Sequence, residues 1–197
     1  MIQSLELDRA GFLAEIDRVS AVYAAAMHPD PAYLPGRASI MERHTGHPGF
    51  LALAVTAQVA GDRPIIAFGY GFRGASGQWW HDVVRAALTA RVGEAAAGAW
   101  LDSSIEIAEL HVHPDFQRRG IGRSLLLGLT AGRHEHTAAL STQDDNSPAR
   151  RLYHSVGFAD LLTGFSFPGG GPPYTVMGAV LPLRPAAQGS AAPDGGG

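Results

Sequence analysis

Gln117-Arg118-Arg119-Gly120-Ile121-Gly122 is the stretch that decides the fold of this chain, because of what flanks it. The run before it, 104–113, is hydrophobic and strand-like. The run after it has apolar residues at 121, 125, 126 and 129, the spacing of an amphipathic helix. A glycine turn between a strand and a helix directs several backbone N–H groups at one point, and the helix dipole adds positive potential there. The sequence therefore predicts a phosphate or pyrophosphate site. Three arginines add charge beside it: Arg118, Arg119 and Arg123.

Composition limits the class of protein. A chain of 197 residues is long enough for one domain with a sizeable core. Its 46% hydrophobic and 17% charged residues are typical of a globular protein and exclude a disordered one. The net charge of -3 gives no general attraction to nucleic acid or acidic membranes, so we expect neither as a partner. The absence of cysteine excludes disulfides, thiolate metal sites and cysteine nucleophiles.

Both ends of the sequence carry an expectation. The first residues lack the basic and then apolar layout of a signal peptide, and no apolar run is long enough to span a bilayer. We therefore expect a cytoplasmic protein. Residues 185–197 consist almost entirely of Ala, Gly, Pro and Ser, which predicts a disordered tail after a single domain at 1–184.

The remaining periodicity predicts an α+β order, with a central, mostly antiparallel sheet and helices on its faces. Strands are expected at 2–7, 50–59, 64–72, 104–113, 138–142, 158–167 and 174–181. Helices are expected at 10–27, 36–45, 78–99, 121–131 and 148–156.

A second motif lies downstream, in the stretch Asn146-Ser147-Pro148-Ala149-Arg150-Arg151-Leu152-Tyr153 followed by Gly157-Phe158. Together with the glycine turn it resembles the GCN5-related N-acetyltransferase (GNAT) superfamily, whose N-x-x-A-x-x-L-Y-x-x-x-G-F pattern it matches at every fixed position. The resemblance covers about 104–160. It implies the GNAT fold, in which a mixed sheet is splayed between its fourth and fifth strands.

The resemblance also implies acetyl-CoA as cosubstrate. In that family the glycine turn holds the pyrophosphate, and the pantetheine arm pairs with the preceding strand in the gap of the sheet. Asn146 matches the position whose side chain hydrogen-bonds the cofactor. The implied binding residues are Leu110, His111, Val112, Gln117, Arg118, Arg119, Gly120, Ile121, Gly122, Arg123 and Asn146.

Acetyl transfer from a thioester to an amine makes three chemical demands. The amine must lose a proton before it attacks, the oxyanion needs a hydrogen-bond donor, and the departing thiolate benefits from an acid. The backbone N–H of Val112 is a candidate donor. Tyr153 matches the position of the family's general acid, although a helix tyrosine can also simply pack in a core.

Two glutamates of the strand are candidates for the base. In a regular strand 106, 108, 110 and 112 share one face, and 107, 109, 111 and 113 share the other. Glu106 matches the strand position where several family members carry a catalytic glutamate, and we place it first. Glu109 is nearer to the expected thioester but lies on the opposite face unless a bulge shifts the register. The alternative is that both carboxylates simply face solvent.

Two further motifs have simpler readings. The stretch 69–74 fits G-x-G-x-x-G, but its glycines lie within and at the end of a predicted strand, so we interpret them as permitting close backbone packing. The histidines lack the number and spacing of a known metal site, so no metal is expected.

Trp79 and Trp80 open the predicted helix 78–99, which either walls the acceptor pocket, forms a dimer surface or packs in the core.

The function that this implies is N-acetyltransfer from acetyl-CoA to a primary amine, by direct attack in a ternary complex. The acceptor is a small molecule or a peptide amine, and a homodimer is possible. The alternative is a GNAT-fold module that binds acyl-CoA as a sensor or scaffold without turnover. A protein that binds nucleotides through the glycine turn alone would leave the second motif unexplained.

Overall fold

The computed structural model describes residues 2–144 and 147–184. Its strands form one seven-stranded sheet in the order β1-β2-β3-β4-β5-β7-β6. The strands are β1 Ile2–Leu7, β2 Leu51–Ala57, β3 Ile65–Arg73, β4 Ser104–Val112, β5 Thr137–Gln143, β6 Ala159–Phe165 and β7 Tyr174–Val180. The predicted tail at 185–197 and the predicted cofactor residue Asn146 lie outside the described residues.

Seven α-helices and two short 3-10 helices connect the strands in the described part of the chain. The α-helices are α1 Arg9–Ala14, α2 Ile16–Met27, α3 Leu34–His44, α4 Trp79–Val92, α5 Glu94–Leu101, α6 Ile121–Thr130 and α7 Pro148–Ser155. The 3-10 helices are η1 Pro31–Tyr33 and η2 Pro114–Phe116. None of the helices within 2–144 and 147–184 combines the length and hydropathy that crossing a membrane requires.

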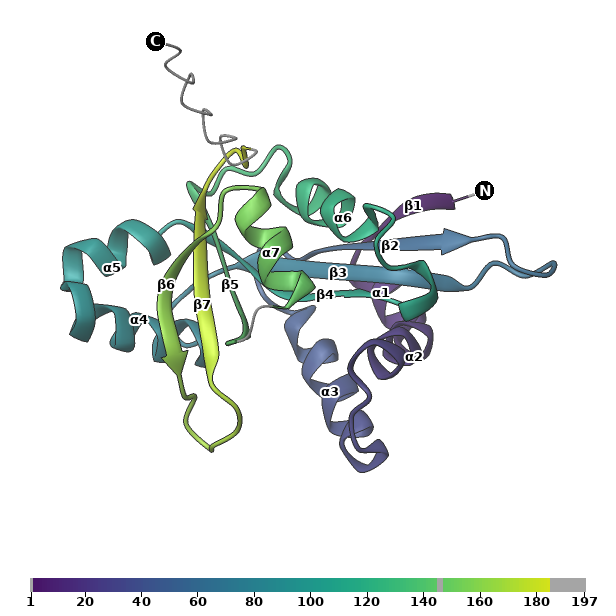
Figure 1. Ribbon diagram of the computed structural model, residues 1–197, viewed down its shortest axis with the longest axis horizontal. Helices are drawn as coiled ribbons and strands as arrows, with labels where there is room; N and C mark the ends of the chain where they lie inside the picture. The colour runs from purple at the N-terminus through teal and green to yellow at the C-terminus, as the bar shows by residue number, and fades with distance from the viewer. Residues whose placement is uncertain (1, 145–146, 185–197) are drawn as a thin grey trace, which may run out of the picture.

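The sheet opens between β4 and β5. All neighbouring strands pair antiparallel except these two, which are parallel and pair only from Ser104 to Glu106. Beyond Glu106 the strands diverge, and Figure 1 shows β5, β6 and β7 turned away from the direction of β2, β3 and β4. The predicted mixed sheet, splayed between its fourth and fifth strands, is confirmed.

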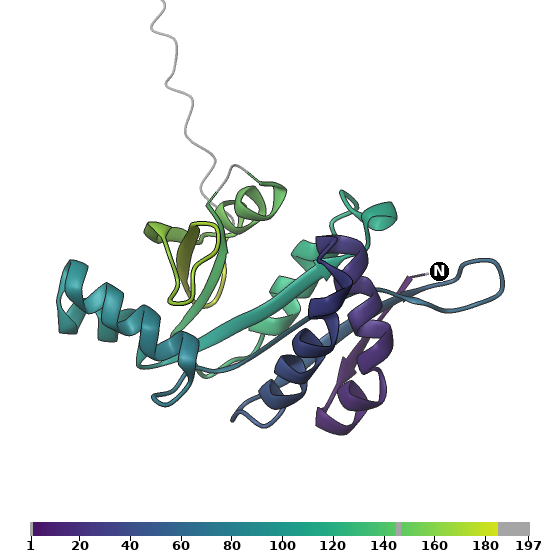
Figure 2. The same cartoon turned by 90° about the horizontal axis from the view of Figure 1, so that it is seen from below.

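Helices cover both faces of the sheet, as predicted. One core cluster joins α6 and α7 to β4, β5 and β7. On the opposite face, α1, α2 and α3 pack on β2 and β3, while α4 and α5 pack on β5, β6 and β7. Figure 2 shows these two helix groups at opposite ends of the molecule. The site described below lies between them.

Two predicted helices are broken in the structure. The helix expected at 10–27 divides at Glu15, whose φ of -104° and ψ of 8° end α1 and begin α2. The helix expected at 78–99 divides at Gly93, which has a positive φ of 85°, and its second part, α5, continues to Leu101. Apolar periodicity runs on across both breaks, because each pair of helices packs on one face of the sheet, so the pattern alone does not reveal them.

The two strand glycines of the G-x-G-x-x-G stretch bring β3 close to β4, as interpreted from the sequence. A Cβ on Gly69 would lie 2.8 Å from the Leu110 side chain, and one on Gly71 would lie 2.7 Å from the Glu106 carbonyl. The contact at Gly71 is with backbone and too short for any Cβ, so that position requires glycine, whereas a Cβ at Gly69 would force the Leu110 side chain to shift.

β4 contains a bulge. Tyr70 of β3 lies opposite Glu109, whereas the next residue, Gly71, lies opposite Ile107. Ala108 is therefore the extra residue. An extra residue in one strand reverses the alternation of side chains beyond it, so the two halves of β4 present their side chains out of phase.

Candidate active site

The glycine turn forms the exposed N-terminus of α6. Arg118 and Gly120 have positive φ values of 59° and 79°, and no side chain caps the helix. Residues 117–120 are exposed, so the first N–H groups of α6 are open to a ligand. Gly120 is required by its conformation, whereas a Cβ on Gly122 would lie 3.3 Å from the Leu152 side chain. Gly122 therefore also lets α6 approach α7.

Side chains of the turn brace it from outside. The Gln117 amide donates to the Val112 carbonyl at 3.0 Å, and Arg119 donates to the Asp115 carbonyl at 3.0 Å. Arg119 also lies over the Phe116 ring, at 5.3 Å from its centre. Arg123 donates to the Ser155 hydroxyl at 3.2 Å and so links α6 to α7. The turn is held open by these contacts and is not filled by its own side chains.

β4 has a free edge next to this turn. Among the described residues, β5 pairs with β4 only as far as Glu106, so 107–112 lack a neighbour on that side. The His113 N–H donates to the Ile66 carbonyl of β3 at 2.8 Å. Because backbone groups alternate in direction along a strand, those of Leu110 and Val112 point to the free edge and those of His111 point to β3.

The bulge places both candidate glutamates on one face of β4. Ile107 and Leu110 both pack with the α6–α7 cluster. Glu106 contacts α4 and Glu109 contacts α3, which are helices of the opposite face. The regular alternation that separated the two carboxylates does not hold, and the bulge that the sequence left open as a condition is present.

Glu106 forms a buried pair with His81 of α4. Its Oε1 lies 2.8 Å from His81 Nδ1, and each of the two residues is 3% exposed. Burial raises the pKa of the Glu106 carboxyl, while the hydrogen bond and charge of His81 oppose this rise. Neither carboxylate faces solvent, so the surface alternative is wrong for both Glu106 and Glu109.

Glu109 lies between a cation and a ring. Its carboxylate is paired with Arg37 of α3 through one oxygen and with His111 Nε2 through the other. Arg37 in turn lies over the Tyr23 ring, 5.2 Å from its centre, and the same ring meets His111 edge-on at 5.2 Å. Glu109 is thus fixed by α2 and α3, the helices of the first half of the chain.

A second polar pair lies next to Glu109, on β3 and α3. The Tyr70 hydroxyl and His44 Nδ1 are 3.0 Å apart. Burial lowers the pKa of His44 to about 4, with His47 contributing in the same direction. Burial also raises the pKa of Tyr70 well above its ordinary value, and the charge of Glu109 adds to this. Both groups are therefore neutral at physiological pH.

Tyr153 is deeply buried in α7. Its ring packs 5.7 Å from that of Phe158 in the cluster that joins α6 and α7 to the sheet. Burial, and then the charge of Glu109, raise the pKa of its hydroxyl, so Tyr153 keeps its proton. The helix begins at a Ser147 cap, whose hydroxyl accepts from the Arg150 N–H at 3.2 Å, and Pro148 suits its first turn.

An aromatic row borders the site on the side of the β6–β7 loop. Phe167 contacts Trp79, Phe165 and Tyr174, with ring centres 5.5, 4.9 and 5.4 Å away. Burial has the largest effect on the pKa of the Arg37 guanidinium and lowers it, whereas Glu109 and, more weakly, Tyr23, Tyr70 and Tyr174 raise it. Trp79 is 58% exposed, whereas Trp80 donates to the Ser141 hydroxyl of β5 at 3.1 Å.

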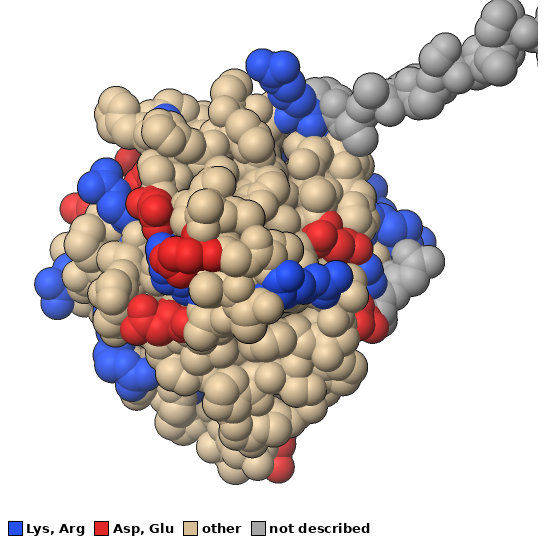
Figure 3. Space-filling model, turned by 90° about the vertical axis from the view of Figure 1, so that its left-hand side faces the viewer, with Lys and Arg blue, Asp and Glu red and all other residues tan. Residues whose placement is uncertain are grey.

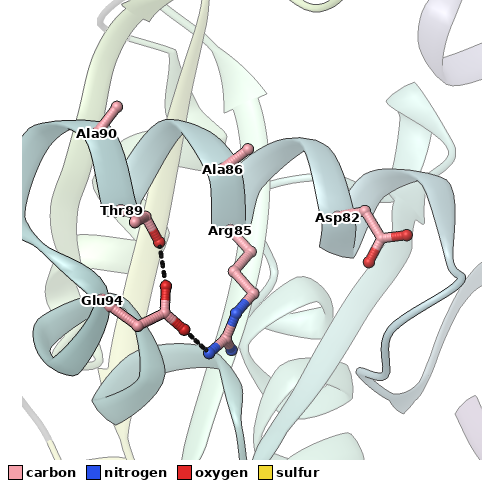
Figure 4. Close-up of a pocket in the computed structure, with 6 residues that line it drawn as sticks. All are labelled: Asp82, Arg85, Ala86, Thr89, Ala90 and Glu94. Carbon is pink, nitrogen blue, oxygen red and sulfur yellow. Dashed lines mark hydrogen bonds and ion pairs between the residues drawn. The ribbon is translucent and has the colours of Figure 1, made fainter.

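A hollow lies between α4, the helix that carries His81, and α5. Figure 3 shows acidic and basic side chains side by side on this end of the molecule. A shallow hollow of about 460 Å³ lies between the two helices, with Arg85 bonded to Glu94 inside it (Figure 4). Its lining residues are Asp82, Arg85, Ala86, Thr89, Ala90 and Glu94. None of them contacts Glu106, Glu109 or Tyr153 through a hydrogen bond or ion pair in the described structure.

Sequence reasoning missed the partners of the two glutamates. Arg37, His81, Tyr23, Tyr70 and His44 come from four elements that precede β4 in the chain. No short motif links them, because sheet topology brings them together. The sequence does not set Arg37 or His81 apart, because α3 and α4 each contain several other charged residues.

The comparisons with known proteins agree on one family. A profile of the acetyltransferase (GNAT) domain matches residues 78–160. A GCN5-like protein acetyltransferase of Mycobacterium tuberculosis is 37% identical over 137 residues, which is 67% of this chain and 66% of that protein, slightly under two thirds of its length.

Solved structures share the fold at low identity. The ribosomal-protein-S18-alanine N-acetyltransferase of Escherichia coli has a TM-score of 0.59 and 18% identity, covering 96% of this chain and 98% of its own. The PaiA N-acetyltransferase of Thermoplasma acidophilum, solved in complex with coenzyme A, has a TM-score of 0.55 and 13% identity, covering 91% and 99%. With its splayed sheet, its two motifs and these relatives, the chain belongs to the GCN5-related N-acetyltransferase (GNAT) superfamily.

Proposed function

We propose that this protein transfers an acetyl group from acetyl-CoA to a primary amine by direct attack in a ternary complex. One observation carries the proposal: the free edge of β4 runs from the open N-terminus of α6 to two buried carboxylates. That edge offers a path for a long cofactor arm that ends in a reactive thioester.

The pyrophosphate binds at the glycine turn. Its oxygens accept from the backbone N–H groups of 117–122, and Arg118 and Arg123 add charge. The pantetheine arm pairs with the free edge of β4, where Leu110 and Val112 present their backbone groups. The Val112 carbonyl already accepts from Gln117, so the arm pairs with the Leu110 carbonyl, and the N–H groups of Leu110 and Val112 stay available for the thioester. His111 contributes through its side chain.

The thioester lies at the bulge. Each residue of a strand spans about 3.3 Å, so the arm reaches the bulge within a few residues of the turn. The Leu110 N–H is then nearer to the thioester carbonyl than the Val112 N–H. We propose Leu110 as the oxyanion donor in addition to Val112.

Proton transfers follow from the buried groups. An ammonium acceptor gives one proton to the Glu106 carboxylate through water, and its nitrogen then attacks the thioester carbon. The C–N bond forms, the C–S bond breaks, and Tyr153 donates its proton to the departing sulfur. The second proton of the nitrogen restores Tyr153, so one proton is released per turnover. Glu109 holds Arg37 and His111 beside the acceptor.

The acceptor is a protein or peptide amine. The mycobacterial relative is named as a protein acetyltransferase, and the Escherichia coli structure is that of a ribosomal-protein-S18-alanine N-acetyltransferase. The aromatic row from Trp79 to Tyr174 gives a partly exposed surface beside the site for the flanking residues of such a peptide.

Thiol release from acetyl-CoA tests the proposal. The assay compares a lysine peptide with a blocked N-terminus, a lysine-free peptide with a free N-terminus, and spermidine, and calorimetry measures CoA binding in parallel. Release with at least one peptide is expected. Binding without release on any amine would favour the non-catalytic acyl-CoA-binding module. Absence of CoA binding would contradict both functions.

A further inference from the structure

The buried pair of His81 and Glu106 joins two parts of the fold that the family motifs do not connect. His81 lies in the first turn of α4, and Glu106 lies near the start of β4. Resting on the proposed function, we propose that His81 is the positioning residue that holds the Glu106 carboxylate and sets the pH range in which it takes up the proton of the acceptor amine.

The pair lies where the sheet opens. Glu106 is the last residue of β4 that pairs with β5, where it lies opposite Ala139. Its carboxylate faces α4, on the same side of the sheet as Glu109. A proton acceptor at this point is next to the free edge of β4 and is shielded from bulk solvent. Burial raises its basicity, which suits a general base at neutral pH.

The surrounding backbone leaves the pair little room to move. A Cβ on Gly74 would lie 2.5 Å from Glu106 Oε1 and 3.0 Å from His81 Nδ1, so glycine is required where this turn covers the pair. The Gly74 N–H donates to the Ser104 carbonyl at 2.9 Å. The Gln78 side chain closes the same turn, donating to the Arg73 carbonyl at 3.0 Å and accepting from the Ala75 N–H at 3.1 Å.

His81 is the group that most favours the ionised form of Glu106. From α4, His81 lowers the pKa of Glu106 and Asp82 raises it, while burial is the largest effect and raises it. The residues opposite Glu106 on β3 and β5 are Phe72 and Ala139, which are apolar. Ser104, on β4 itself, contributes a hydroxyl that donates to the Leu101 carbonyl at 3.1 Å. Removing the imidazole therefore takes away the nearest group that offsets the effect of burial on the pKa of the Glu106 carboxyl.

The experiment follows the carboxyl carbon of Glu106 by 13C NMR across pH, assigned by its loss in Glu106→Gln. In His81→Phe, which keeps a ring but loses the hydrogen bond, we expect the titration midpoint to rise by about one pH unit. In His81→Asn, whose amide can still donate, we expect a smaller rise. His134→Asn, an exposed histidine, is the matched control and leaves the midpoint unchanged.

Activity provides the second readout. The acid limb of kcat/KM against pH moves upward with the Glu106 midpoint in His81→Phe, while the KM for acetyl-CoA stays the same. In a Glu106→Gln background, His81→Phe lowers kcat/KM no further, whereas in the presence of Glu106 it lowers kcat/KM on the acid limb by about tenfold. Additive losses would mean that His81 acts only through packing, which overturns the inference.

The two proposals fail differently. An unmoved Glu106 midpoint in both His81 variants overturns the inference whatever the activity. An acid limb that does not follow a moved midpoint overturns Glu106 as the proton acceptor. A moved midpoint in a protein that releases no thiol with any amine supports the pairing and contradicts the proposed function.

Discussion

Glu106 and Glu109 lie on the same face of β4 although three positions separate them, because the bulge at Ala108 reverses the alternation between them. They have different partners. Glu106 is paired with the imidazole of His81, and Glu109 with the guanidinium of Arg37. We propose proton uptake for the first and acceptor positioning for the second.

Replacing Gly122 with glutamate tests the phosphate site. The side chain would bring a negative charge to the open N–H groups of α6, so CoA affinity should fall more than 100-fold in calorimetry. Gly122→Ala is the control, because its Cβ meets the same Leu152 contact at 3.3 Å without the charge. An equal loss in both variants would attribute the effect to packing of α6 on α7.

Tyr153→Phe tests the general acid. The hydroxyl keeps its proton because burial and the charge of Glu109 raise its pKa. Its removal should lower kcat by about 10- to 100-fold with little change in the KM for acetyl-CoA. Steady-state kinetics with a peptide acceptor measure both. An unchanged kcat would leave Tyr153 as a core residue only.

Replacing Arg37 alone should destabilise the fold more than replacing Arg37 and Glu109 together. Arg37→Ala leaves a buried carboxylate without its cation, which destabilises the fold by about 1–3 kcal/mol, given that the Arg37 side chain is 34% exposed. The double variant with Glu109→Gln should recover part of this loss. Urea denaturation of the three variants gives the coupling, and additive losses would contradict a specific pair.

Stability should fall between about pH 6.5 and pH 4 because of His44. Burial lowers the pKa of His44 from 6.5 to about 4, so the unfolded chain binds a proton in this range that the folded protein does not. The folded state is therefore favoured above pH 6.5 and loses this contribution, on the order of 2 kcal/mol, as the pH falls to 4. His44→Gln should show a shallower fall in thermal melting across this window. An identical slope would place the cause in other groups.

Variants at Trp79 and Trp80 distinguish the three possible roles of α4, which are acceptor binding, dimer formation and core packing. Trp79→Ala removes an exposed ring that contacts Phe167 and should raise the KM for a peptide acceptor several-fold, with the KM for acetyl-CoA unchanged. Trp80→Phe removes the hydrogen bond to Ser141 and should mainly lower the melting temperature. Light scattering of Trp79→Ala also checks for a dimer. Unchanged acceptor KM and unchanged mass would remove α4 from both roles.

The order of elements could be predicted from sequence because strands and helices differ in the spacing of their apolar residues. The glycine turn was predictable for the same local reason: Gly120 needs a positive φ and the following run begins a helix. The bulge at Ala108 was not, since nothing in Glu106-Ile107-Ala108-Glu109 indicates which residue is extra. Arg37 and His81 reach β4 only through tertiary packing, so their roles required the structure.

The most direct test of the central claim is a 15N NMR titration of the protein with CoA. We expect the largest amide shifts on Gly120, Ile121 and Gly122 of the turn and on Leu110 and Val112 of the free edge. Shifts concentrated elsewhere, for example around Arg85 in the hollow between α4 and α5, with the turn and the edge unmoved, would contradict it.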